Sequence, residues 1–495
     1  MYYFCGDYTN YKMENDDNNV IGRFSEVKKF QTFLKSTEPE FLSVYGRRRV
    51  GKTYLIRQFF KDQIVFDFTG TKEASLEVQL DNFYEEFQKR AHGKYVRQAP
   101  KSWQEAFANL ATYLYSLKSK KDKIVVFIDE MPWLDTPRAN FIPSLEFFWN
   151  QHLSQMNHVI LIACGSATSW IRKNLNNARG GLYNRVTQRM RLAPFTLAET
   201  EDYLRSKRIN LPRKHIIELY MAFGGIPFYL KYIESGKSVL QIINNICFLK
   251  DAPLQDEYKQ LYFSLFRNAE KHEKVIEILA SRPQGLTRKD LLDLTKLPNG
   301  TLSRTLMELE ECDFISMYSP FGKKKKEGVY KLIDNFSLFY LKFMQGQKVL
   351  NGQIWQTMSN DAAYKAWSGY AFENICLLHL PQILTAMGIS GIRVNAFSWK
   401  TPPSDQTSGV QIDLLIDRTD NVINLCEVKF TGDTYIMTKD YADQLRQRRS
   451  IFKLVSKTKK AVFNTLITPY EALKNEHYLD QIHNEVNMDA MFKPL

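Results

Sequence analysis

Hydrophobic and polar positions change their period along the chain, and the changes mark where regions begin and end. Across residues 20–195, short β-branched and aromatic runs alternate with longer stretches of helical period. The clearest predicted strands are 41–45, 64–68, 123–128 and 158–164. This alternation is typical of βαβ units around a parallel sheet. Residues 1–195 are therefore predicted to form an α/β domain.

Three further regions follow with different patterns. Residues 196–266 are helical in period around Gly224-Gly225-Ile226-Pro227, which predicts a helical lid. Residues 267–335 predict helices 272–280, 287–294 and 301–312, then strands 314–318 and 328–333, with Thr287 capping the second helix. That order is typical of a winged helix-turn-helix. Residues 336–495 predict an aromatic-rich helical bridge and a second α/β unit.

Composition narrows the class of protein. The 495 residues, 44% hydrophobic and 24% charged, suit a folded chain of several domains at about 150 residues each. No apolar run reaches the roughly 18 residues of a membrane helix, and the first twenty residues lack a secretory pattern. The six cysteines are widely spaced, so we expect a reducing cytoplasm. The net charge of +13 favours a polyanionic partner.

A glycine-containing loop follows strand 41–45 and precedes an amphipathic helix. It matches the GxxxxGK[ST] pattern, in which backbone N–H groups and the helix N-terminus bind phosphates. Lys52 would reach the β- and γ-phosphates and Thr53 would ligate Mg²⁺. The predicted nucleotide-binding residues of this segment are Gly46, Arg47, Arg48, Arg49, Val50, Gly51, Lys52, Thr53 and Tyr54.

Two carboxylates end the buried strand 123–128. Asp129 is placed to hold Mg²⁺, and Glu130 to polarise the attacking water. Because both follow a phosphate loop, the sequence predicts hydrolysis of ATP as well as binding.

These motifs and three others resemble the archaeal-type ATPases related to STAND signalling NTPases, within the wider AAA-like group. The three are Val20-Ile21-Gly22-Arg23-Phe24-Ser25-Glu26, Leu182-Tyr183-Asn184-Arg185 and Phe223-Gly224-Gly225-Ile226-Pro227. The resemblance implies that Gly22, Arg23 and Glu26 lie by the adenine, and that Ser166 holds the sensor position. It makes Arg185 a candidate γ-phosphate-sensing or finger arginine, with a surface or interface arginine as the alternative.

The winged-helix region offers a DNA contact. Asn299, Ser303 and Arg304 open the predicted recognition helix, and Lys323 to Lys326 would form the wing tip. However, residues 271–334 carry twelve basic and ten acidic side chains, so the region is nearly neutral. A packing module between lid and effector is the alternative.

The last region carries a second acidic pattern. Residues 411–417 and 422–430 read as paired strands, and Glu427 and Lys429 share a face because they lie two apart. Asp413 and Glu427 would hold Mg²⁺, and Lys429 would orient the nucleophile or stabilise phosphate charge. A helix predicted to begin at Gly369 carries Glu373.

This pattern resembles the PD-(D/E)xK nuclease core, specifically the DUF234-like domain, in which Glu373 matches the acidic residue of the first helix. A basic run lies just beyond the strand: Arg446, Arg448, Arg449, Lys453, Lys457, Lys459 and Lys460. The alternative is an inactive scaffold with a surface Glu–Lys pair.

The overall prediction is an α/β protein: a P-loop NTPase parallel sheet with helical lid, winged helix-turn-helix and restriction-endonuclease-like domain. We expect an ATP-hydrolysing switch that uses ATP and Mg²⁺ and controls a Mg²⁺-dependent DNA endonuclease. Alternatives are a signalling ATPase whose distal domain only binds DNA or a partner, and a transcriptional regulator led by the winged helix. A nucleotide-dependent homo-oligomer is left open.

Overall fold

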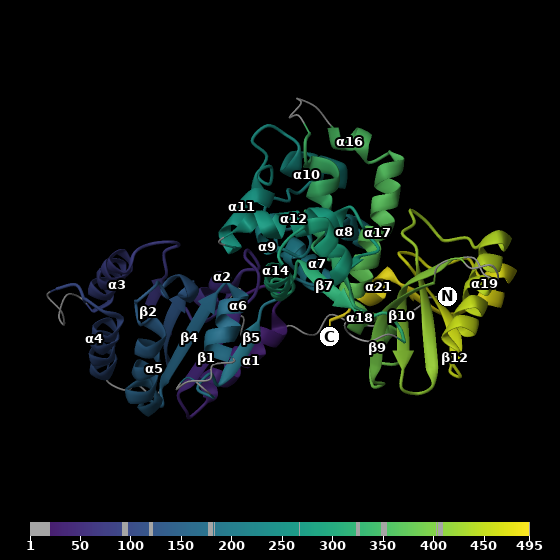
Figure 1. The fold of residues 1–495 in the computed structure, drawn as a ribbon. Helices are drawn as coiled ribbons and strands as arrows, with labels where there is room; N and C mark the ends of the chain where they lie inside the picture. Colours follow the sequence, from purple (N-terminus) through teal and green to yellow (C-terminus); the bar gives the residue numbers. More distant parts are fainter. Residues whose placement is uncertain are drawn as a thin grey trace, which may run out of the picture. The chain divides into compact units, whose positions relative to one another are not determined.

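The computed structural model describes residues 20–91, 98–117, 122–176, 182, 184–266, 268–322, 327–347, 354–401, 403 and 409–494. The chain folds into two compact units (Figure 1). Unit 1 contains the residues up to Tyr45, Gly51–Ser166 and Trp170–Leu192. Unit 2 contains Gly46–Val50, Ala167–Ser169 and the chain from Ala193 onwards. Tyr183 and Lys323 to Lys326, named above, lie outside the described residues.

Unit 1 is built on a five-stranded parallel sheet in the order β2-β3-β4-β1-β5. Its strands are β1 (Glu40–Tyr45), β2 (Ile64–Thr69), β3 (Ile124–Asp129), β4 (Val159–Gly165) and β5 (Gln188–Arg191). The first four confirm the predicted strands to within one residue at each end. β5 was not predicted because its four residues are polar or charged except for Met190, the only buried one. The parallel sheet confirms the α/β class of this region.

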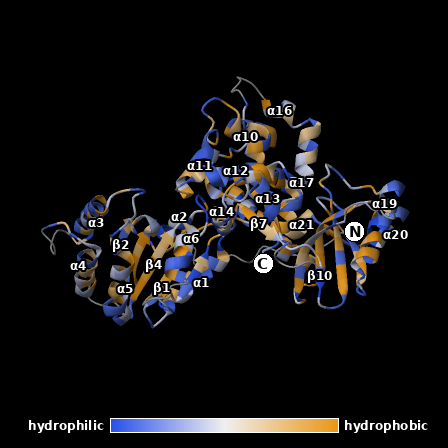
Figure 2. Ribbon diagram, in the orientation of Figure 1, coloured by the Kyte–Doolittle hydropathy of each residue, from blue (hydrophilic) through white to orange (hydrophobic). Residues whose placement is uncertain are grey.

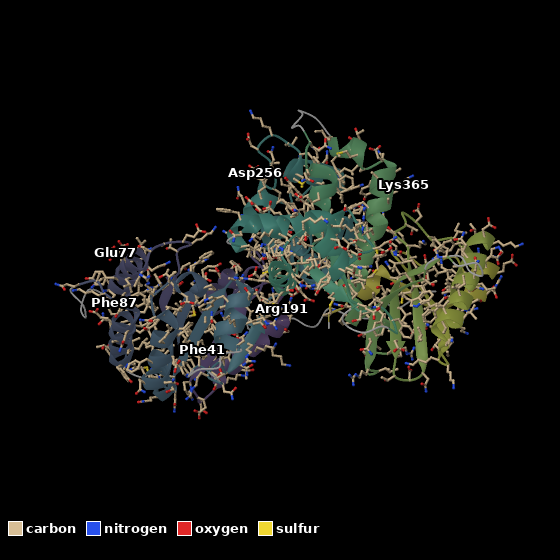
Figure 3. The ribbon with its side chains drawn as sticks, viewed as in Figure 1. Phe41, Glu77, Phe87, Arg191, Asp256 and Lys365 are labelled. Carbon is tan, nitrogen blue, oxygen red and sulfur yellow. The ribbon has the colours of Figure 1, made fainter. Side chains whose placement is uncertain are left out.

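Helices flank this sheet. They are α1 (Phe24–Lys35), α2 (Lys52–Phe59), α3 (Leu76–Ala91), α4 (Trp103–Ser116) and α5 (Phe141–Gln151). The short α6 (Thr168–Ile171) has residues in both units. Val126 and Ile128 of β3 join an aromatic core with α3, α4 and α5, which includes Phe41 and Phe87 (Figure 3). Phe127 points to the opposite face, where the Arg57 guanidinium of α2 lies 5.8 Å from its ring. The alternation along β3 therefore buries both faces of the sheet.

Unit 2 begins with helices, as predicted. They are α7 (Leu197–Ser206), α8 (Arg213–Phe223), α9 (Pro227–Leu230), α10 (Val239–Cys247) and α11 (Glu257–Leu265). The predicted break is present: α8 ends before Gly224, whose φ of 63° suits glycine. Gly225 is also required, because a Cβ there would lie 1.9 Å from the Phe195 carbonyl oxygen.

The next segment holds three helices and a small antiparallel sheet in the order β6-β8-β7. Its elements are α12 (Ala269–Ala280), β6 (Leu286–Thr287), α13 (Arg288–Thr295), α14 (Asn299–Glu311), β7 (Ile315–Tyr318) and β8 (Val329–Leu332). Thr287 caps α13 in a reciprocal capping box with Asp290, as its position predicted. The predicted helix starts, at 272 and 301, lie three residues after the start of α12 and two residues after the start of α14.

A helical bridge follows: α15 (Asn335–Phe339), a π-helical turn (Tyr340–Met344), α16 (Ile354–Met358), α17 (Ala362–Leu378) and α18 (Leu380–Ala386). The aromatic side chains of Phe336, Phe339 and Phe343 are buried, as expected for core residues. The predicted start of the Glu373 helix at Gly369 was wrong. The helix begins seven residues earlier, at Ala362, and Gly369 lies inside it. Nothing lies within 4 Å of where a Cβ of Gly369 would be.

The C-terminal part of unit 2 contains a mixed five-stranded sheet in the order β13-β12-β11-β10-β9. The strands are β9 (Val394–Thr401), β10 (Val410–Arg418), β11 (Val422–Val428), β12 (Ala461–Thr468) and β13 (Ile482–Asn487). The helices are α19 (Lys439–Ser456), α20 (Glu476–Gln481) and α21 (Met488–Met491). The predicted antiparallel pair is β10 and β11, and β10 is largely hydrophobic (Figure 2). None of the described helices is long and apolar enough to cross a membrane.

Candidate functional site

The connection from β1 to α2 has the backbone of a phosphate loop. Gly46 and Gly51 have φ values of 148° and 92°, and Gly51 is the N-cap of α2. Such φ values favour glycine because a Cβ would be strained there. Lys52 and Thr53 consequently fall in the first turn of α2. Lys52 is only 5% exposed.

Strand order brings three polar side chains together at the carboxyl edge of the sheet. β4 lies between β1 and β3, so Ser166 after β4 stands between the residues that follow its neighbours. Lys52 Nζ donates to Ser166 Oγ at 3.0 Å, and this hydroxyl donates to Glu130 Oε1 at 2.8 Å. The Ser166 backbone N–H also donates to Glu130 Oε2 at 3.3 Å. The predicted sensor position is thus a bridge between a lysine and a carboxylate.

A second contact pairs the proposed metal ligands. Thr53 Oγ1 donates to Asp129 Oδ2 at 2.6 Å, and the backbone N–H of Glu130 donates to Asp129 Oδ1 at 2.9 Å. Asp129 is 3% exposed, and burial, followed by the charge of Asp129, raises the pKa of the neighbouring Cys164 thiol. A hydroxyl and a carboxylate side by side are hard oxygen donors of the type that Mg²⁺ prefers. These residues fit the metal that the phosphate loop implies.

Glu130 is held by an unusual backbone. Its φ of 44° lies in the left-handed region, and it precedes a short 3₁₀ turn, Met131–Trp133. A Cβ at Gly70 would lie 2.6 Å from the Glu130 carbonyl oxygen, and the Gly70 N–H donates to the Asp129 carbonyl oxygen at 2.9 Å. Gly70 therefore allows the backbone of Asp129 and Glu130 to lie close to the end of β2, a requirement that the motifs did not predict. The signal available was the glycine directly after β2.

Two arginines of loop residues 46–50, which belong to unit 2, form ion pairs with carboxylates of that unit. Arg47 forms a buried ion pair with Asp334, and its guanidinium lies 4.8 Å from the Phe314 ring. Burial lowers the pKa of Arg47, but attraction to Asp334 outweighs it, so the pKa is raised overall. Arg49 Nη2 lies 2.7 Å from Glu257 Oε2. Because these side chains are directed to carboxylates, the two arginines can offer a nucleotide mainly their backbone N–H groups.

The remaining predicted nucleotide residues lie outside the hydrogen-bonded cluster. Gly22 and Arg23 both have left-handed φ values, 67° and 59°, at the start of α1, and Arg23 Nη1 lies 4.0 Å from Glu26 Oε1. Arg185 is exposed, and its backbone N–H donates to the Leu182 carbonyl oxygen. Three more residues complete the set: Arg48 and Tyr54 are exposed, and Val50 is buried. Their predicted roles remain predictions.

The side-chain carboxylate of Glu427, in the C-terminal part of unit 2, contacts two cationic side chains. Its Oε1 accepts from the Tyr441 hydroxyl and lies 2.9 Å from Lys429 Nζ. Its Oε2 accepts from Arg448 Nη1 at 3.0 Å. Burial, together with the charge of Glu427, raises the pKa of Tyr441. These four side chains form what we call the Glu427 cluster.

The other predicted members of this second site are less defined. Asp413 comes one position before Leu414, which pairs with Cys426, but its own side chain lies outside the described side chains. Glu373 is half-buried on α17, which packs against β11, and its charge adds to burial in raising the pKa of Cys376. Among the described residues, no group of three or more His, Cys, Asp or Glu could hold a metal ion. The described side chains alone do not make the predicted Mg²⁺ site.

Basic residues expected to face DNA are partly engaged elsewhere. In the basic run after β11, Arg446 pairs with Asp443 and Asp480, Arg448 with Glu427, and Lys460 with Asp417. At the start of α14, the Ser303 Oγ and the Asn299 backbone oxygen accept from Arg288 Nη2 of α13, at 2.7 Å and 3.1 Å. Arg304 pairs with Glu308 at 2.9 Å. The polar groups that open α14 are therefore held by contacts within the protein.

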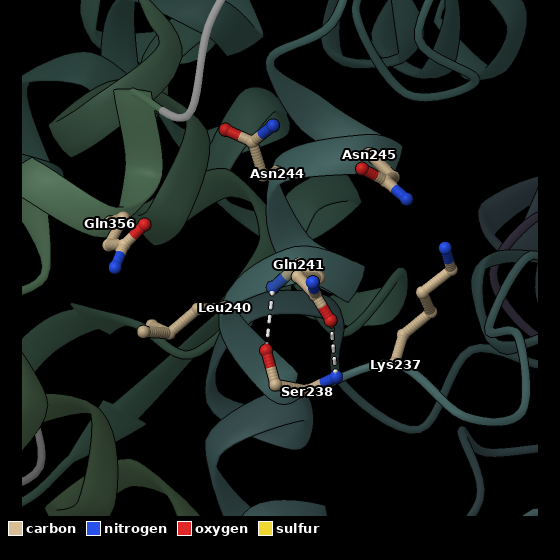
Figure 4. Close-up of a pocket in the computed structure, with 7 residues that line it drawn as sticks. All are labelled: Lys237, Ser238, Leu240, Gln241, Asn244, Asn245 and Gln356. Atoms are coloured by element: carbon tan, nitrogen blue, oxygen red, sulfur yellow. Dashed lines mark hydrogen bonds between the residues drawn. The ribbon is translucent and has the colours of Figure 1, made fainter.

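A cavity of about 460 Å³ lies on α10 (Figure 4). It is lined by Lys237, Ser238, Leu240, Gln241, Asn244, Asn245 and Gln356. Ser238 and Gln241 are occupied in the capping box of α10. Because this lining contains no carboxylate, histidine or cysteine, it offers no group for acid–base or metal chemistry.

Known proteins resemble this chain over its N-terminal part and beyond. Residues 21–233 match the family described as an ATPase domain predominantly from Archaea. A Methanocaldococcus jannaschii protein, "Uncharacterized protein MJECL04", is 24% identical over 366 residues, which cover 72% of this chain and 76% of that protein. A second protein of that organism, "Uncharacterized protein MJ1637", is 19% identical over 329 residues, 61% of each chain.

Solved structures give weaker likenesses. A Walker-type ATPase of Pyrococcus abyssi has a TM-score of 0.48 and 18% identity, covering 66% of this chain and 97% of that one. The ORC2 protein of Aeropyrum pernix, in ADPNP–ADP complexes, has a TM-score of 0.44 and 14% identity, covering 66% and 95%. The family match over residues 21–233, together with the phosphate loop and the Asp129–Glu130 strand end, supports an archaeal-type P-loop ATPase for this part of the chain.

Proposed function

We propose that this chain binds Mg²⁺–ATP and hydrolyses it. The observation that supports this most strongly is the contact series Lys52, Ser166, Glu130, beside the Thr53–Asp129 pair. A phosphate-binding cation, two oxygen ligands and a carboxylate base then lie at one edge of one sheet. Phosphoryl transfer needs positioning and charge stabilisation more than covalent chemistry, and this set supplies both.

Each side chain has a distinct task in this proposal. Lys52 binds the β- and γ-phosphates, and its three N–H donors allow it to keep Ser166 as well. Thr53 and Asp129 would hold Mg²⁺, which neutralises charge on the β- and γ-oxygens when bound. Glu130 orients the attacking water and accepts its proton. Ser166 fixes the distance between the phosphate-binding lysine and that base.

Lys52→Ala tests the proposal directly. Phosphate release from ATP should fall by at least about 10²-fold, as when a preorganised charge-stabilising donor is removed. Lys61→Ala is the matched control, because Lys61 is exposed just beyond the same helix. If Lys52→Ala keeps turnover while the fold is intact, Lys52 has no role in the site.

We further propose that ATP turnover controls the C-terminal domain as a Mg²⁺-dependent DNA endonuclease. Support comes from Lys429 and Glu427, whose charged groups lie 2.9 Å apart, and from Glu373 on a helix that packs on the same strand. Asp413 would be the second metal ligand. The proposal keeps the four-part division at 1–195, 196–266, 267–335 and 336–495, with 267–335 as a winged helix-turn-helix.

Plasmid DNA incubated with Mg²⁺, with and without ATP, tests this step. Wild type should nick or cut in an ATP-dependent way, and Asp413→Ala should not. Asp420→Ala is the control, because Asp420 lies in the exposed turn after β10. An equal absence of cleavage in wild type and Asp413→Ala would overturn the nuclease proposal.

A second candidate is a signalling ATPase whose C-terminal domain binds DNA or a partner without cleaving. The contacts of Arg448 and Tyr441 with Glu427 favour it, because they occupy both oxygens of that carboxylate. This candidate predicts salt-sensitive DNA binding with no strand breaks.

Light scattering with and without ATP would show whether a homo-oligomer forms.

A further inference from the structure

A second cavity, of about 290 Å³, lies within unit 2 where α13 and β8 meet strands β9 and β10. Its walls include Arg288 and Lys289 of α13, Lys331 of β8 and Lys400 of β9. Neither the predicted nucleotide residues nor the Glu427 cluster contribute to it.

The cavity has a fixed frame. Pro320 forms a β-bridge with Ser398, and the Phe321 N–H donates to the Ser398 carbonyl oxygen at 3.2 Å. The Phe321 ring lies 5.6 Å from the rings of both Phe397 and Phe452. The segment after β7 is thus joined to β9 by backbone and aromatic contacts, which gives the cavity a preformed wall.

Positive charge converges on this cavity from three elements. Its lining carries four cationic side chains and one carboxylate, Glu327, so the formal balance of four minus one is +3. Lys289 and Lys400 are exposed, whereas Lys331 is only 3% exposed. The Thr287 hydrogen bond lowers the pKa of Asp290, and the charges of Lys400 and Lys289 lower it further. The charges of Lys289 on α13 and Lys400 on β9 are therefore both felt at Asp290.

The lining also offers neutral hydrogen-bonding groups and a flat apolar wall. Ser398 and Gln411 contribute polar atoms, and Trp399, 7% exposed, contributes the apolar surface. Concave walls, clustered cations and few competing carboxylates suit a tetrahedral dianion or a phosphodiester better than a neutral ligand.

We propose that this cavity binds a phosphate group, supplied by a nucleic-acid backbone. The part of this proposal that assigns the phosphate to a nucleic acid rests on the DNA partner of the proposed function. The part that assigns a phosphate to the cavity does not. The contacts of α14 support this location, because Asn299 and Ser303 are bonded to Arg288 and Arg304 to Glu308. Two exposed lysines, Lys289 of α13 and Lys400 of β9, border the cavity instead. DNA backbone contact accordingly belongs to the junction of β8 and β9 more than to α14.

The test uses the full-length chain with two double variants of equal charge change. Lys289→Gln/Lys400→Gln removes two cavity lysines, and Lys237→Gln/Lys274→Gln removes two exposed lysines elsewhere in unit 2. Affinity for a labelled DNA duplex is measured over a salt series, and inorganic phosphate binding is measured by calorimetry. Thermal unfolding confirms that all proteins are folded.

The cavity variant should weaken DNA binding and reduce the slope of log affinity against log salt by about 2, while the control keeps the wild-type slope. Loss of inorganic phosphate binding with unchanged DNA binding would assign the cavity to a small phosphate ligand. If the cavity variant matches the control in both measurements, the proposal is overturned. If wild type binds no DNA, the DNA partner fails, and the phosphate measurement still decides the cavity.

Discussion

Two carboxylate sites in this chain lie at similar places and differ in what contacts them. Asp129 and Glu130 end β3 and accept hydrogen bonds from the hydroxyls of Thr53 and Ser166. Glu427, near the end of β11, instead contacts Lys429, Arg448 and the Tyr441 hydroxyl. Strand ends therefore supply the carboxylates in both units, and the partners decide their chemistry.

Charge makes the contrast quantitative. The nucleotide cluster holds Lys52 against Asp129 and Glu130, a formal balance of one minus two, or −1. The Glu427 cluster holds Lys429 and Arg448 against one carboxylate, two minus one, or +1. The first balance attracts a divalent cation. The second does so only if Asp413 adds its carboxylate, as the proposed Mg²⁺ site requires.

The largest expected effect comes from removing the hydroxyl that pairs with Asp129. Thr53→Val should lower ATP turnover by at least about 10²-fold, because a lost metal ligand removes several kcal/mol of charge stabilisation. Thr53→Ser keeps the hydroxyl and should retain most activity. Phosphate release over a Mg²⁺ titration measures both. Equal turnover in the two variants would show that the Thr53 hydroxyl is not a metal ligand.

Acid should affect unit 2 through His379, independently of either cluster. Burial lowers the pKa of His379 to about 4, and its Nε2 accepts from the Leu197 N–H at 3.0 Å. The unfolded imidazole takes up a proton below about pH 6.5 and the folded one only below about 4, so stability is lost as pH falls between these values.

The expected loss is about 1.4 kcal/mol per pH unit across that window. Urea unfolding at pH 7.0, 6.0 and 5.0 would measure it, as wild type against His379→Gln. The variant should show a shallower pH dependence. If both proteins lose stability at the same rate, His379 is not the titrating group, and acid inactivation could then be assigned to the carboxylates.

A smaller effect is expected at the bridge between Lys52 and Glu130. Ser166→Ala removes two side-chain hydrogen bonds, and at about 1 kcal/mol each the turnover should fall by roughly 5- to 30-fold. Ser116→Ala, an exposed serine on α4, serves as the control. Unchanged turnover would show that Ser166 is structural, and the nucleotide cluster would then reduce to its charged members.

The smallest effect concerns the Glu427 cluster. Arg448→Gln should cost less than about 1 kcal/mol of stability, because its side chain is 34% exposed and such ion pairs contribute little. Urea denaturation measures this, and DNA affinity measured in parallel should decrease. A loss of several kcal/mol would show instead that the cluster is a buried structural element.

The sequence could predict what local patterns specify. Period-2 and helical runs located β1 to β4, and the phosphate loop and Asp129–Glu130 were recognisable from spacing alone. The short β5 was missed because its exposed polar side chains give no apolar signal. The helix of Glu373 was misplaced because Gly369, a common helix breaker, lies inside it.

Contacts across long sequence separations were not predictable. Arg47 and Asp334 are 287 positions apart, and no local pattern links a loop arginine to the N-cap of α15. The bonds from Arg288 to α14 likewise depend on how two helices pack, so Asn299 and Ser303 were expected to face DNA. The requirement for Gly70 depends on a close approach to Glu130 that only the fold shows.

In the proposed mechanism, Glu130 is the base of an ATP-hydrolysing site. Steady-state phosphate release and nucleotide affinity of Glu130→Gln, beside wild type and the exposed control Glu85→Gln, test it most directly. In Glu130→Gln, ATP binding should stay close to wild type and turnover should fall by about 10²- to 10⁴-fold, the usual contribution of a general base. Wild-type turnover in Glu130→Gln, with the control equally active, would contradict it.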